Sequence, residues 1–325
     1  MAVLVSGGAG YIGSHMAHAL CDAGERVVVV DDLSTGQRAS VPGAATFVQA
    51  DIADQDAMAE TLRRHQVTAI AHFAARIVVP DSVTDPLGYY LANTVKTRAL
   101  IDAAVAGGVG HFIFSSTAAV YGDAGEGAVD EDAPLAPVSP YGRSKLMSEW
   151  MLQDAGRAYG LKYAALRYFN VAGADPRGRT GQSTPNATHL IKVACQAALG
   201  KRDRLQVFGT DYPTPDGSCV RDYIHVTDLA DAHVQALRYL RSGGDSFTAN
   251  CGYGRGLSVL EVIRAVEQVT GRALPVEIAP RRAGDPARIV ASPARIQSLL
   301  DWRPRHDSID EIVGSALNWE QRLGG

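Results

Sequence analysis

A glycine-rich stretch near the N-terminus constrains the fold more than any other feature of this sequence. The apolar run Val3–Val5 breaks into a turn with glycines at positions 7, 8, 10 and 13, and a helical pattern follows. A pyrophosphate would explain this spacing. The backbone must turn tightly at Gly7, the phosphates must approach a position without a side chain at Gly10, and the helix must pack close to the strand at Gly13. Free N–H groups at the helix start would face the anion. The stretch therefore predicts a strand, a phosphate-binding turn and a helix.

A second apolar run indicates which dinucleotide binds. Residues 26–30 form a predicted buried strand that ends at Asp31, close to the offset of about twenty residues at which a carboxylate meets a ribose diol. Asp31 would repel a 2′-phosphate, so we expect NAD rather than NADP as the cofactor. The alternative is that Asp31 only caps a loop.

Apolar runs alternate with helix-period segments through the first half of the chain, which is typical of an α/β protein with a doubly wound parallel sheet, the Rossmann fold. We predict strands near 2–6, 26–30, 45–49, 68–73, 110–115 and 162–168. We predict helices near 11–23, 54–64, 84–107 and 140–159, and shorter ones near 188–199, 226–241, 258–270 and 308–322.

The second half of the chain predicts a smaller lobe that is interleaved with the sheet. Residues 1–170 are expected to form the NAD-binding Rossmann domain, with later returns to the sheet near 220–255 that include a strand at 248–252. Residues 171–325 are expected to form mainly a substrate-binding lobe. The segment 173–185, rich in Gly, Pro, Asp and Arg, predicts a mobile connection or lid.

The composition argues against several classes of partner. With 31 Lys and Arg against 35 Asp and Glu, the net charge is -4, so we expect neither nucleic acid nor a membrane as a partner. The four cysteines lack C-x-x-C and Cys/His ligand spacing, which argues against disulfides and a metal site. A charged leader and an apolar run of about 18 residues are both missing. We therefore expect a cytoplasmic protein that acts on a small molecule.

Tyr141 and Lys145 stand at i and i+4 at the start of a predicted helix, so they share one face of it. A free tyrosine titrates near pH ~10, but a neighbouring ammonium and a positive nicotinamide ring favour tyrosinate, which can act as a base. Thr117, in a hydroxyl cluster after the predicted fifth strand, can supply a second hydrogen bond. Taken alone, the pair is more often a packed tyrosine beside a solvated lysine. Its position after the dinucleotide turn favours a nicotinamide oxidoreductase site.

Four motifs together carry a resemblance to a known family. They are Gly-Gly-x-Gly-Tyr-Ile-Gly at 7–13, Ser-Ser-Thr-x-x-Val-Tyr-Gly at 115–122, Pro-Tyr-Gly-x-Ser-Lys at 140–145 and Arg-Tyr-Phe-Asn at 167–170. With them, the chain resembles the extended short-chain dehydrogenase/reductase superfamily and, within it, the NAD-dependent epimerase/dehydratase family. The likeness runs nearly end to end and continues at 189–191, 207–212, 220–226 and 281–285.

The resemblance implies that bound NAD takes a hydride from sugar C4 and returns it to the opposite face, which interconverts UDP-glucose and UDP-galactose. It implies a homodimer, and Tyr141, Lys145 and Thr117 as catalytic residues. The implied NAD-binding residues are Gly7, Gly10, Tyr11, Ile12, Gly13, Asp31, Asp32, Leu33, Ser34, Thr35, Gly36, Asp51, Ile52, Phe73, Ala74, Ala75, Asn93, Ser115, Tyr141, Lys145 and Phe169. The implied UDP-sugar residues are Thr117, Tyr141, Asn170, His189, Leu190, Gln206, Val207, Phe208, Arg221, Arg282 and Asp285.

Departures from the family pattern leave alternatives open. Ile77 stands where many relatives carry a lysine beside the cofactor. A nucleotide-sugar 4,6-dehydratase would need an acid and a base where this chain has Ala118 and Ala119, so we rank it low. A 4-epimerase of another UDP-sugar (an N-acetylhexosamine, a pentose or a uronic acid) stays open, with Ile289 near the expected pocket wall. A non-catalytic NAD-binding protein is the remaining alternative.

Overall fold

The computed structural model describes residues 1–125, 127–184, 187–282 and 285–324, and the chain divides into two compact units. Unit 1 comprises Met1–Val120, Pro137–Arg167 and Ala230–Ala249. Unit 2 comprises Tyr121–Ala136, Tyr168–Leu229 and Asn250–Gly325. Each unit is thus assembled from separated stretches of the chain, and each is described by itself below.

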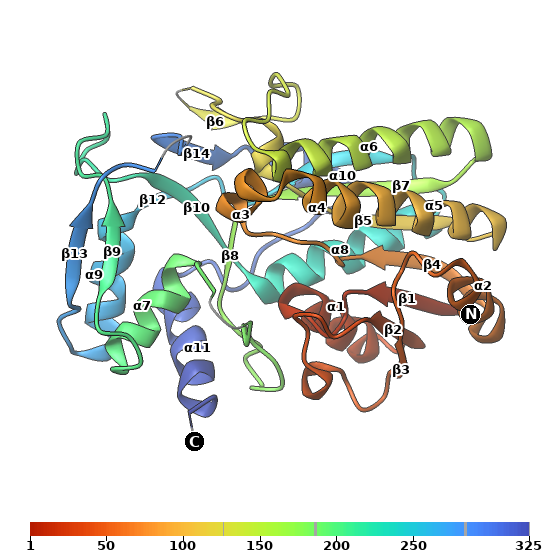
Figure 1. Ribbon diagram of the computed structural model, residues 1–325, viewed down its shortest axis with the longest axis horizontal. Coiled ribbons are helices and arrows are strands. Elements are labelled where there is room, and N and C mark those ends of the chain that lie inside the picture. Colours follow the sequence, from red (N-terminus) through yellow and green to blue (C-terminus); the bar gives the residue numbers. More distant parts are fainter. Residues whose placement is uncertain (126, 185–186, 283–284, 325) are drawn as a thin grey trace. The chain divides into compact units, whose positions relative to one another are not determined.

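A seven-stranded sheet forms the centre of unit 1, with the strand order β11-β7-β5-β4-β1-β2-β3 (Figure 1). Its strands are β1 (Ala2–Ser6), β2 (Val27–Asp31), β3 (Thr46–Gln49), β4 (Val67–His72), β5 (His111–Thr117), β7 (Lys162–Tyr168) and β11 (Phe247–Cys251). The pairs β1–β2, β1–β4, β2–β3 and β4–β5 are parallel. The predicted doubly wound sheet is confirmed, and the strand predicted at 248–252 does return to it as β11. The strand order reverses between β1 and β4, where ligands bind in sheets of this kind.

Helices cover both faces of this sheet (Figure 1). They are α1 (Tyr11–Asp22), α2 (Gln55–His65), α3 (Val79–Thr84), α4 (Pro86–Tyr90), α5 (Lys96–Ala106), α6 (Pro140–Tyr159) and α8 (Val226–Arg241), with short helical turns at Arg38–Ser40 and Ala118–Val120. On one face Met58 of α2, Leu100 of α5 and Leu152 of α6 pack with Leu4 and Phe112 of the sheet. Helices α1 and α8 lie on the other face.

Helix α6 has clear signals at both ends. The Ser139 side chain accepts a hydrogen bond from Gly142 N at 3.1 Å, and Pro140 occupies the first turn, where its missing N–H costs nothing. Gly160 ends the helix in the left-handed region, with φ of 74°. The helix predicted at 140–159 is confirmed, and Tyr141 lies in its first turn.

The helix predicted near 84–107 is confirmed, because α4, a π-helical turn at Leu91–Val95 and α5 follow one another without a gap from Pro86 to Ala106. The π-helical turn inside it was not predicted. Pro86 has no N–H to continue a helix from α3, and the Asp85 side chain starts α4 anew by accepting from Gly88 N at 3.1 Å. The π-helical turn contains Asn93, whose side chain bonds outside the helix.

Unit 2 contains two smaller sheets. The five-stranded sheet has the order β12-β10-β14-β6, with β8 paired to β10, and β13 pairs with β9. The strands are β6 (Ala128–Val129), β8 (Asn170–Ala172), β9 (Leu205–Phe208), β10 (Val220–His225), β12 (Gly256–Ser258), β13 (Val276–Ala279) and β14 (Arg288–Ala291). Of the region near 220–255, β10 therefore pairs in unit 2 and β11 pairs in the large sheet.

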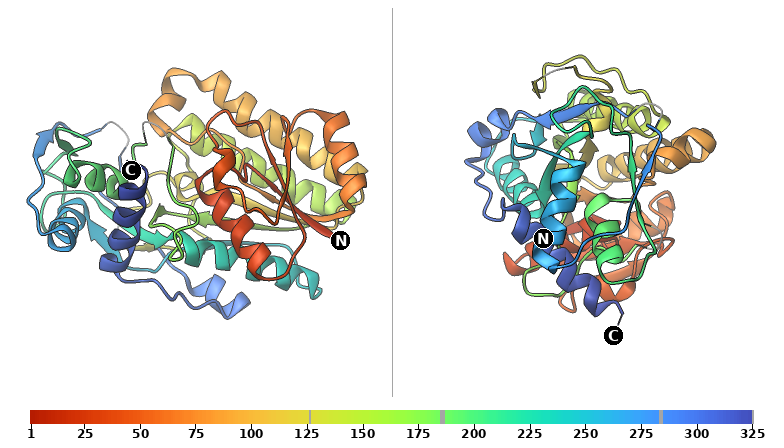
Figure 2. Two further views of the ribbon diagram at one scale, coloured as in Figure 1. Left: turned by 90° about the horizontal axis from the view of Figure 1, so that it is seen from below. Right: turned by 90° about the vertical axis from the view of Figure 1, so that its left-hand side faces the viewer.

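Helices α7 (Leu190–Ala198), α9 (Val259–Thr270) and α11 (Ile309–Arg322) share one apolar core in unit 2, and Figure 2 shows them together in both views. Ile191, Val262 and Ile312 are buried in that core. These three helices were predicted, whereas α10 (Ala294–Leu300) was not. Within the described ranges, none of the helices has the length and apolar character that a membrane span requires.

Candidate active site

The glycine turn between β1 and α1 leaves no room for side chains at two of its three predicted positions. Gly7 has φ of +70°, and a Cβ there would lie 2.5 Å from Ala74 N, at the end of β4. A Cβ on Gly13 would lie 2.1 Å from Gly7 O. At Gly10, which caps α1, the nearest contact of a Cβ is Gly7 O at 3.2 Å. The turn therefore brings helix and strand close together and exposes backbone at Gly10, which fits the pyrophosphate of NAD.

Asp31 ends β2 with its carboxylate against this turn. Its Oδ2 accepts from Ala9 N and its Oδ1 from Leu33 N, both at 2.9 Å. Burial raises the pKa of the Asp31 carboxyl, and the two N–H donors oppose that shift. A carboxylate has about four acceptor sites, so Asp31 can still accept from ribose hydroxyls. The position and charge of this group fit NAD.

Other predicted cofactor residues follow the carboxyl ends of neighbouring strands. In the loop after β2, Ser34 N and Oγ donate to Asp32 Oδ1 at 2.8 and 2.6 Å. After β3, Asp51 forms an ion pair with Lys96. After β4, Phe73 N donates to Ser6 O at 2.9 Å. The remaining ones in unit 1 lie at the start of α1 (Tyr11, Ile12), in the β2 loop (Leu33, Thr35, Gly36), after β4 (Ala74, Ala75) and on β5 (Ser115).

Two predicted cofactor residues have structural partners of their own. The Ile52 side chain packs in the core of unit 1. The buried Asn93 amide accepts from Arg76 N at 2.8 Å and donates to Arg76 O at 2.9 Å and Ser144 Oγ at 3.1 Å. Asn93 thus ties the loop after β4 to α6, and its contact with NAD stays a prediction.

Tyr141 and Thr117 meet where α6 begins and β5 ends. Both are buried, and the Thr117 hydroxyl hydrogen-bonds the Tyr141 phenol. Burial raises the pKa of Tyr141 to about 12, and the Thr117 hydrogen bond lowers it in part. We expected a tyrosinate near neutrality. In the protein by itself the phenol is protonated, because desolvation outweighs the stabilisation of the anion.

Lys145 is buried one turn further along α6. Its Nζ donates to Ser115 O at 2.8 Å and lies 4.9 Å from the centre of the Phe114 ring. Burial lowers the pKa of Lys145 to about 7, and the Glu149 carboxylate opposes that shift. The lysine is therefore a buried ammonium that loses its proton near neutrality. It is not the solvated lysine that the Tyr141–Lys145 spacing alone would suggest.

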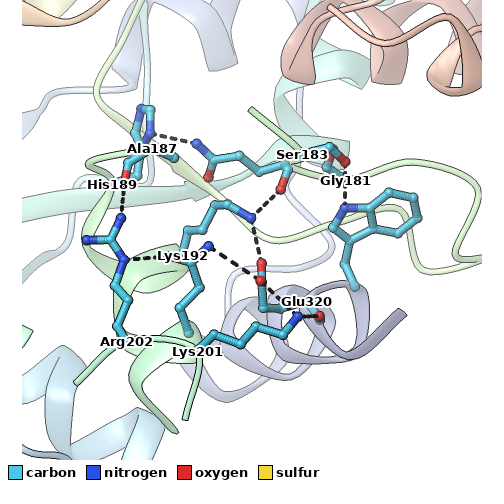
Figure 3. Close-up of polar contacts among 11 residues, drawn as sticks. Gly181, Ser183, Ala187, His189, Lys192, Lys201, Arg202 and Glu320 are labelled. Atoms are coloured by element: carbon cyan, nitrogen blue, oxygen red, sulfur yellow. Dashed lines mark hydrogen bonds and ion pairs between the residues drawn. The ribbon is translucent and has the colours of Figure 1, made fainter. Parts of the chain in front are cut away.

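His189, which precedes α7 in unit 2, lies in a polar network (Figure 3). Gln182 Nε2 contacts His189 Nδ1 at 2.7 Å. Lys192 Nζ donates to Gln182 O at 2.7 Å and to Glu320 Oε2 at 2.5 Å. Burial lowers the pKa of His189, and the Lys192 charge lowers it further. Because an amide nitrogen can only donate, His189 is neutral with its proton on Nε2.

A cleft within unit 2 brings three predicted substrate residues together. Asn170, His189 and Leu190 line it, and so do Lys192 and Trp319. Asn170 reaches this position as the first residue of β8, and Phe169, predicted to contact NAD, directly precedes it.

Four of the six remaining predicted substrate residues form two pairs in unit 2. Arg221 of β10 lies 3.6 Å from Asp285, measured from Nη2 to Oδ1. The Arg282 guanidinium lies 3.6 Å from the centre of the Phe208 ring. Gln206 Nε2 donates to Glu277 at 3.2 Å, whereas the Val207 side chain is buried in the core. Ala283 and Gly284 of the quoted 281–285 motif lie outside the described residues.

The predicted lid has several contacts within unit 2. Arg179 forms an ion pair with Asp175 at 2.8 Å, and Arg322 of α11 donates to Gly178 O at 2.7 Å. The Trp319 indole N–H donates to Ser183 Oγ at 3.1 Å. Pro185, the last residue of the predicted segment, lies outside the described residues. The mobility of this segment stays a prediction.

A buried group near the predicted catalytic pair, Glu149, was not predicted from the sequence. Glu149 accepts from Arg167 at 2.6 Å and from Ser116. A signal was available, because Glu149 lies four residues after Lys145 and Arg167 opens the Arg-Tyr-Phe-Asn motif. In the ranges that the structure describes, no group of three or more His, Cys, Asp or Glu side chains could hold a metal ion.

Comparison with known proteins gives one consistent result. The model of the NAD dependent epimerase/dehydratase family matches residues 3–252. A curated UDP-glucose 4-epimerase of Azospirillum brasilense is 58% identical over 99% of this chain and 92% of its own length.

Solved structures agree with this match. The UDP-glucose 4-epimerase of Brucella ovis in complex with NAD has a TM-score of 0.95 and 44% identity, and the match covers 98% of each chain. The enzyme of the same name from Stenotrophomonas maltophila, with bound NAD and formylated UDP-arabinopyranose, has a TM-score of 0.96 and 41% identity. That match covers 100% of this chain and 99% of the other.

Proposed function

This chain belongs to the NAD dependent epimerase/dehydratase family, and we propose that it interconverts UDP-glucose and UDP-galactose by epimerisation at C4. The observation that carries the proposal is the buried Tyr141–Thr117 pair, with Lys145 beside it, in a chain that matches such epimerases over its whole length. A non-catalytic protein on this fold would have no need to keep these three side chains buried together.

Tyr141 moves the proton in both half-reactions. When bound, NAD supplies a hydride acceptor and then the hydride donor, so the reaction has no net redox change. In the first half-reaction Tyr141 takes the proton of the sugar 4-hydroxyl while C4 loses a hydride, which leaves a 4-keto sugar. In the second half-reaction Tyr141 returns the proton to the C4 oxygen as C4 regains a hydride on its other face.

Tyr141 must lose its proton before it can act as a base, although burial raises its pKa to about 12. Thr117 stabilises the phenolate by its hydrogen bond, and the Lys145 ammonium adds a positive charge one turn away. The charge of the oxidised nicotinamide acts in the same direction. We expect the phenol to become a competent base only when these groups act together.

Unit 2 supplies groups suited to hold UDP. Arg221 and Arg282 can give bidentate hydrogen bonds to the diphosphate, and Asp285 can accept from ribose hydroxyls. Phe208 offers an aromatic face for the uracil ring. His189, neutral and protonated on Nε2, can donate to a carbonyl oxygen. Strong contacts to UDP and few to the hexose would let the 4-keto sugar turn over between the two hydride transfers.

Two observations bear on the alternatives. Ala118 and Ala119 lie directly after β5, where a dehydratase needs an acid and a base, and neither side chain can exchange a proton. Other UDP-sugars remain a second candidate, because the Stenotrophomonas enzyme was crystallised with a UDP-pentose derivative. Ile289, which pairs with Arg221 across β14 and β10, is the residue whose size we expect to decide this.

We further propose that the protein is a homodimer. Val83, Leu87, Leu91 and Val95 recur every four residues along α3, α4 and the π-helical turn of unit 1, and each is at least half exposed, from 52% to 78%. Trp150 of α6 is 52% exposed as well. An apolar surface of this regularity is typical of a protein interface, and a second copy of the chain supplies the same surface. Sedimentation should give a dimer for the wild type and a monomer for Leu87→Glu with Leu91→Glu.

The test of the function is turnover of a panel of UDP-hexoses, UDP-pentoses and UDP-N-acetylhexosamines without added cofactor. We expect UDP-galactose and UDP-glucose to be the best substrates, and failure on every sugar would overturn the proposal. We place the reaction in the cytoplasm, because the spacing of the four cysteines does not suggest a disulfide framework.

A further inference from the structure

Helix α6 carries a third polar side chain in line with the catalytic pair. Tyr141, Lys145 and Glu149 follow one another at intervals of four residues, and each contacts one of the successive β5 residues 115–117. The first two contacts are part of the proposed reaction. The third, from the Ser116 hydroxyl to Glu149 Oε1, has no role in it so far.

Glu149 accepts three hydrogen bonds from two side chains. Arg167 of β7 donates to it twice, from Nε to Oε1 at 3.0 Å and from Nη2 to Oε2 at 2.6 Å. The Glu149 and Arg167 side chains are only 7% and 5% exposed. With Ser116 as the third donor, both carboxylate oxygens are fixed in one orientation.

The charges in this region depend on one another. Lys145 and Arg167 are two buried cations. Glu149 is the buried anion that pairs with Arg167 and acts on Lys145 from the next turn of α6. Burial lowers the pKa of Lys145 to about 7, and Glu149 is the group that opposes the shift. Removing the carboxylate would leave the Lys145 ammonium with burial unopposed, so the lysine would lose its proton in neutral solution.

Other titratable groups near Lys145 and Glu149 cannot replace the carboxylate. His72 of β4 feels the Lys145 charge, but burial lowers the pKa of His72 to about 3, so it is neutral. Tyr141 is protonated, because burial raises its pKa to about 12. Tyr163 of β7, which feels Glu149, also has its pKa raised by burial and stays neutral.

We propose that Glu149, fixed by Arg167 and Ser116, is a positioning residue that keeps the Lys145 ammonium charged and holds α6 in register with β5. Its importance for catalysis rests on the proposed function. Its effect on the charge of Lys145 is independent of the proposed function, so it can be tested on the protein without substrate.

The test follows Lys145 directly by NMR. The chain has five lysines, Lys96, Lys145, Lys162, Lys192 and Lys201, so ¹³C-labelled lysine gives few signals, and Lys145→Met assigns the one that matters. We expect Glu149→Gln to lower the titration midpoint of Lys145 by about one pH unit or more. Glu25→Gln, which makes the same change in the ion pair with Arg241 of unit 1, should leave it unchanged.

Two further variants separate charge from structure. Glu149→Asp keeps the negative charge, so the titration midpoint of Lys145 should stay close to that of the wild type. The double variant Glu149→Gln with Arg167→Met removes both charges of the Glu149–Arg167 ion pair, so Arg167 is not left buried without its partner. It serves as the test if Glu149→Gln does not fold.

An unchanged Lys145 midpoint in a folded Glu149→Gln, or a midpoint in the double variant no lower than in Arg167→Met alone, would show that Glu149 is only structural and overturn the inference. Activity on UDP-sugars, measured separately, should fall in Glu149→Gln most strongly on the alkaline side of the pH profile. If the wild type had no activity on any UDP-sugar, the proposed function would be wrong, but the titration result for Lys145 would still hold.

Discussion

Lys145 Nζ donates a 2.8 Å hydrogen bond to the Ser115 carbonyl oxygen, and this contact helps to set the position of α6 along β5. One helical turn earlier the same alignment brings Tyr141 to the Thr117 hydroxyl. The sequence spacing of Tyr141 and Lys145 is useful because the lysine anchors to the strand that carries the second hydroxyl. Burial of the Lys145 ammonium at this position also has a cost in free energy that can be measured.

The first prediction concerns the pH dependence of stability. Burial lowers the pKa of Lys145 to about 7, whereas a lysine in an unfolded chain titrates near ~10.4. Between these values the unfolded chain binds more protons than the folded protein, so the contribution of Lys145 to the free energy of unfolding rises with pH. Relative to Lys145→Met, the wild type should gain up to roughly 1 kcal/mol per pH unit from pH 7 to 9.

Urea unfolding of both proteins at pH 7, 8 and 9 measures this gain. Lys162→Met is the control, because Lys162 is 43% exposed in an ion pair with Asp245. A difference between wild type and Lys145→Met that does not vary with pH would contradict the shifted pKa.

The second prediction concerns the glycine turn. Gly13→Ala places a Cβ 2.1 Å from Gly7 O. Because Gly7 O is a backbone atom that cannot turn aside, helix α1 must move away from the glycine turn. We expect loss of bound NAD and a lower melting temperature. In Gly43→Ala the new methyl meets open space in the same unit, and NAD content should equal that of the wild type. Absorbance and release of nucleotide from the purified proteins give the result. Full NAD content in Gly13→Ala would remove the turn from the cofactor site.

The third prediction concerns the choice of dinucleotide. The Asp31 carboxylate takes hydrogen bonds from Ala9 N and Leu33 N and would lie against a 2′-phosphate. NADP should therefore bind far more weakly than NAD. Asp31→Asn removes the repulsion and should reduce the ratio of the NAD and NADP affinities at least tenfold. Calorimetry on protein stripped of nucleotide measures both affinities. An unchanged preference in Asp31→Asn, or NADP in the purified wild type, would show that another residue selects the cofactor.

Local signals made much of unit 1 predictable from the sequence. The buried strands β1, β2 and β4 are short apolar runs, and α6 has a serine cap, a proline in its first turn and a terminal glycine. These determinants lie within a few residues of the structures they specify. The π-helical turn within the helix predicted at 84–107 had no local signal, because it contains Asn93, whose partners Arg76 and Ser144 are distant in the sequence.

The structure of unit 2 and the surroundings of the site were harder to predict from the sequence. Its strands have three to six residues in most cases, as in β12 and β10, too short for a period to show. Glu149 and Arg167 are both charged, and charged residues are normally expected at the surface. Only the fold brings them together and buries them. The raised pKa of Tyr141 was missed for the same reason, since desolvation depends on the packing around the phenol.

The fourth prediction concerns the range of sugars. Ile289 is 8% exposed and pairs with Arg221 on the neighbouring strand, so we place it at the wall of the sugar site. Its intermediate size should allow weak activity on UDP-N-acetylglucosamine. That activity should rise in the order wild type, Ile289→Val, Ile289→Gly as room for the acetyl group grows. Relative kcat/KM for the N-acetyl and plain hexose substrates is the measurement, and a fall along this series would place the wall elsewhere.

The last prediction concerns the route of hydrogen in the proposed reaction. A hydride removed from C4 must be returned by the same cofactor molecule, so turnover needs no added NAD. The proton that Tyr141 takes comes from oxygen and returns to oxygen, so hydrogen on carbon never exchanges with water. In deuterated water we expect inversion at C4 with no deuterium on any carbon, which mass spectrometry of the recovered sugar detects. A 4,6-dehydratase removes the C5 proton and replaces it from solvent, so it would incorporate deuterium at C5, and such a result would refute the proposed route.

Tyr141→Phe tests the same route from the protein side. It removes the base and the hydrogen bond with Thr117 but keeps the ring, which is buried at the start of α6. NAD and UDP-sugar binding should persist while kcat falls by roughly a hundredfold or more, the usual effect of removing a general base. Thr117→Ser is the matched control, because it keeps the hydroxyl and should retain most of the rate. If Tyr141→Phe were as active as the wild type, another group would have to carry the proton, and the buried Tyr141–Thr117 pair would lose its proposed role.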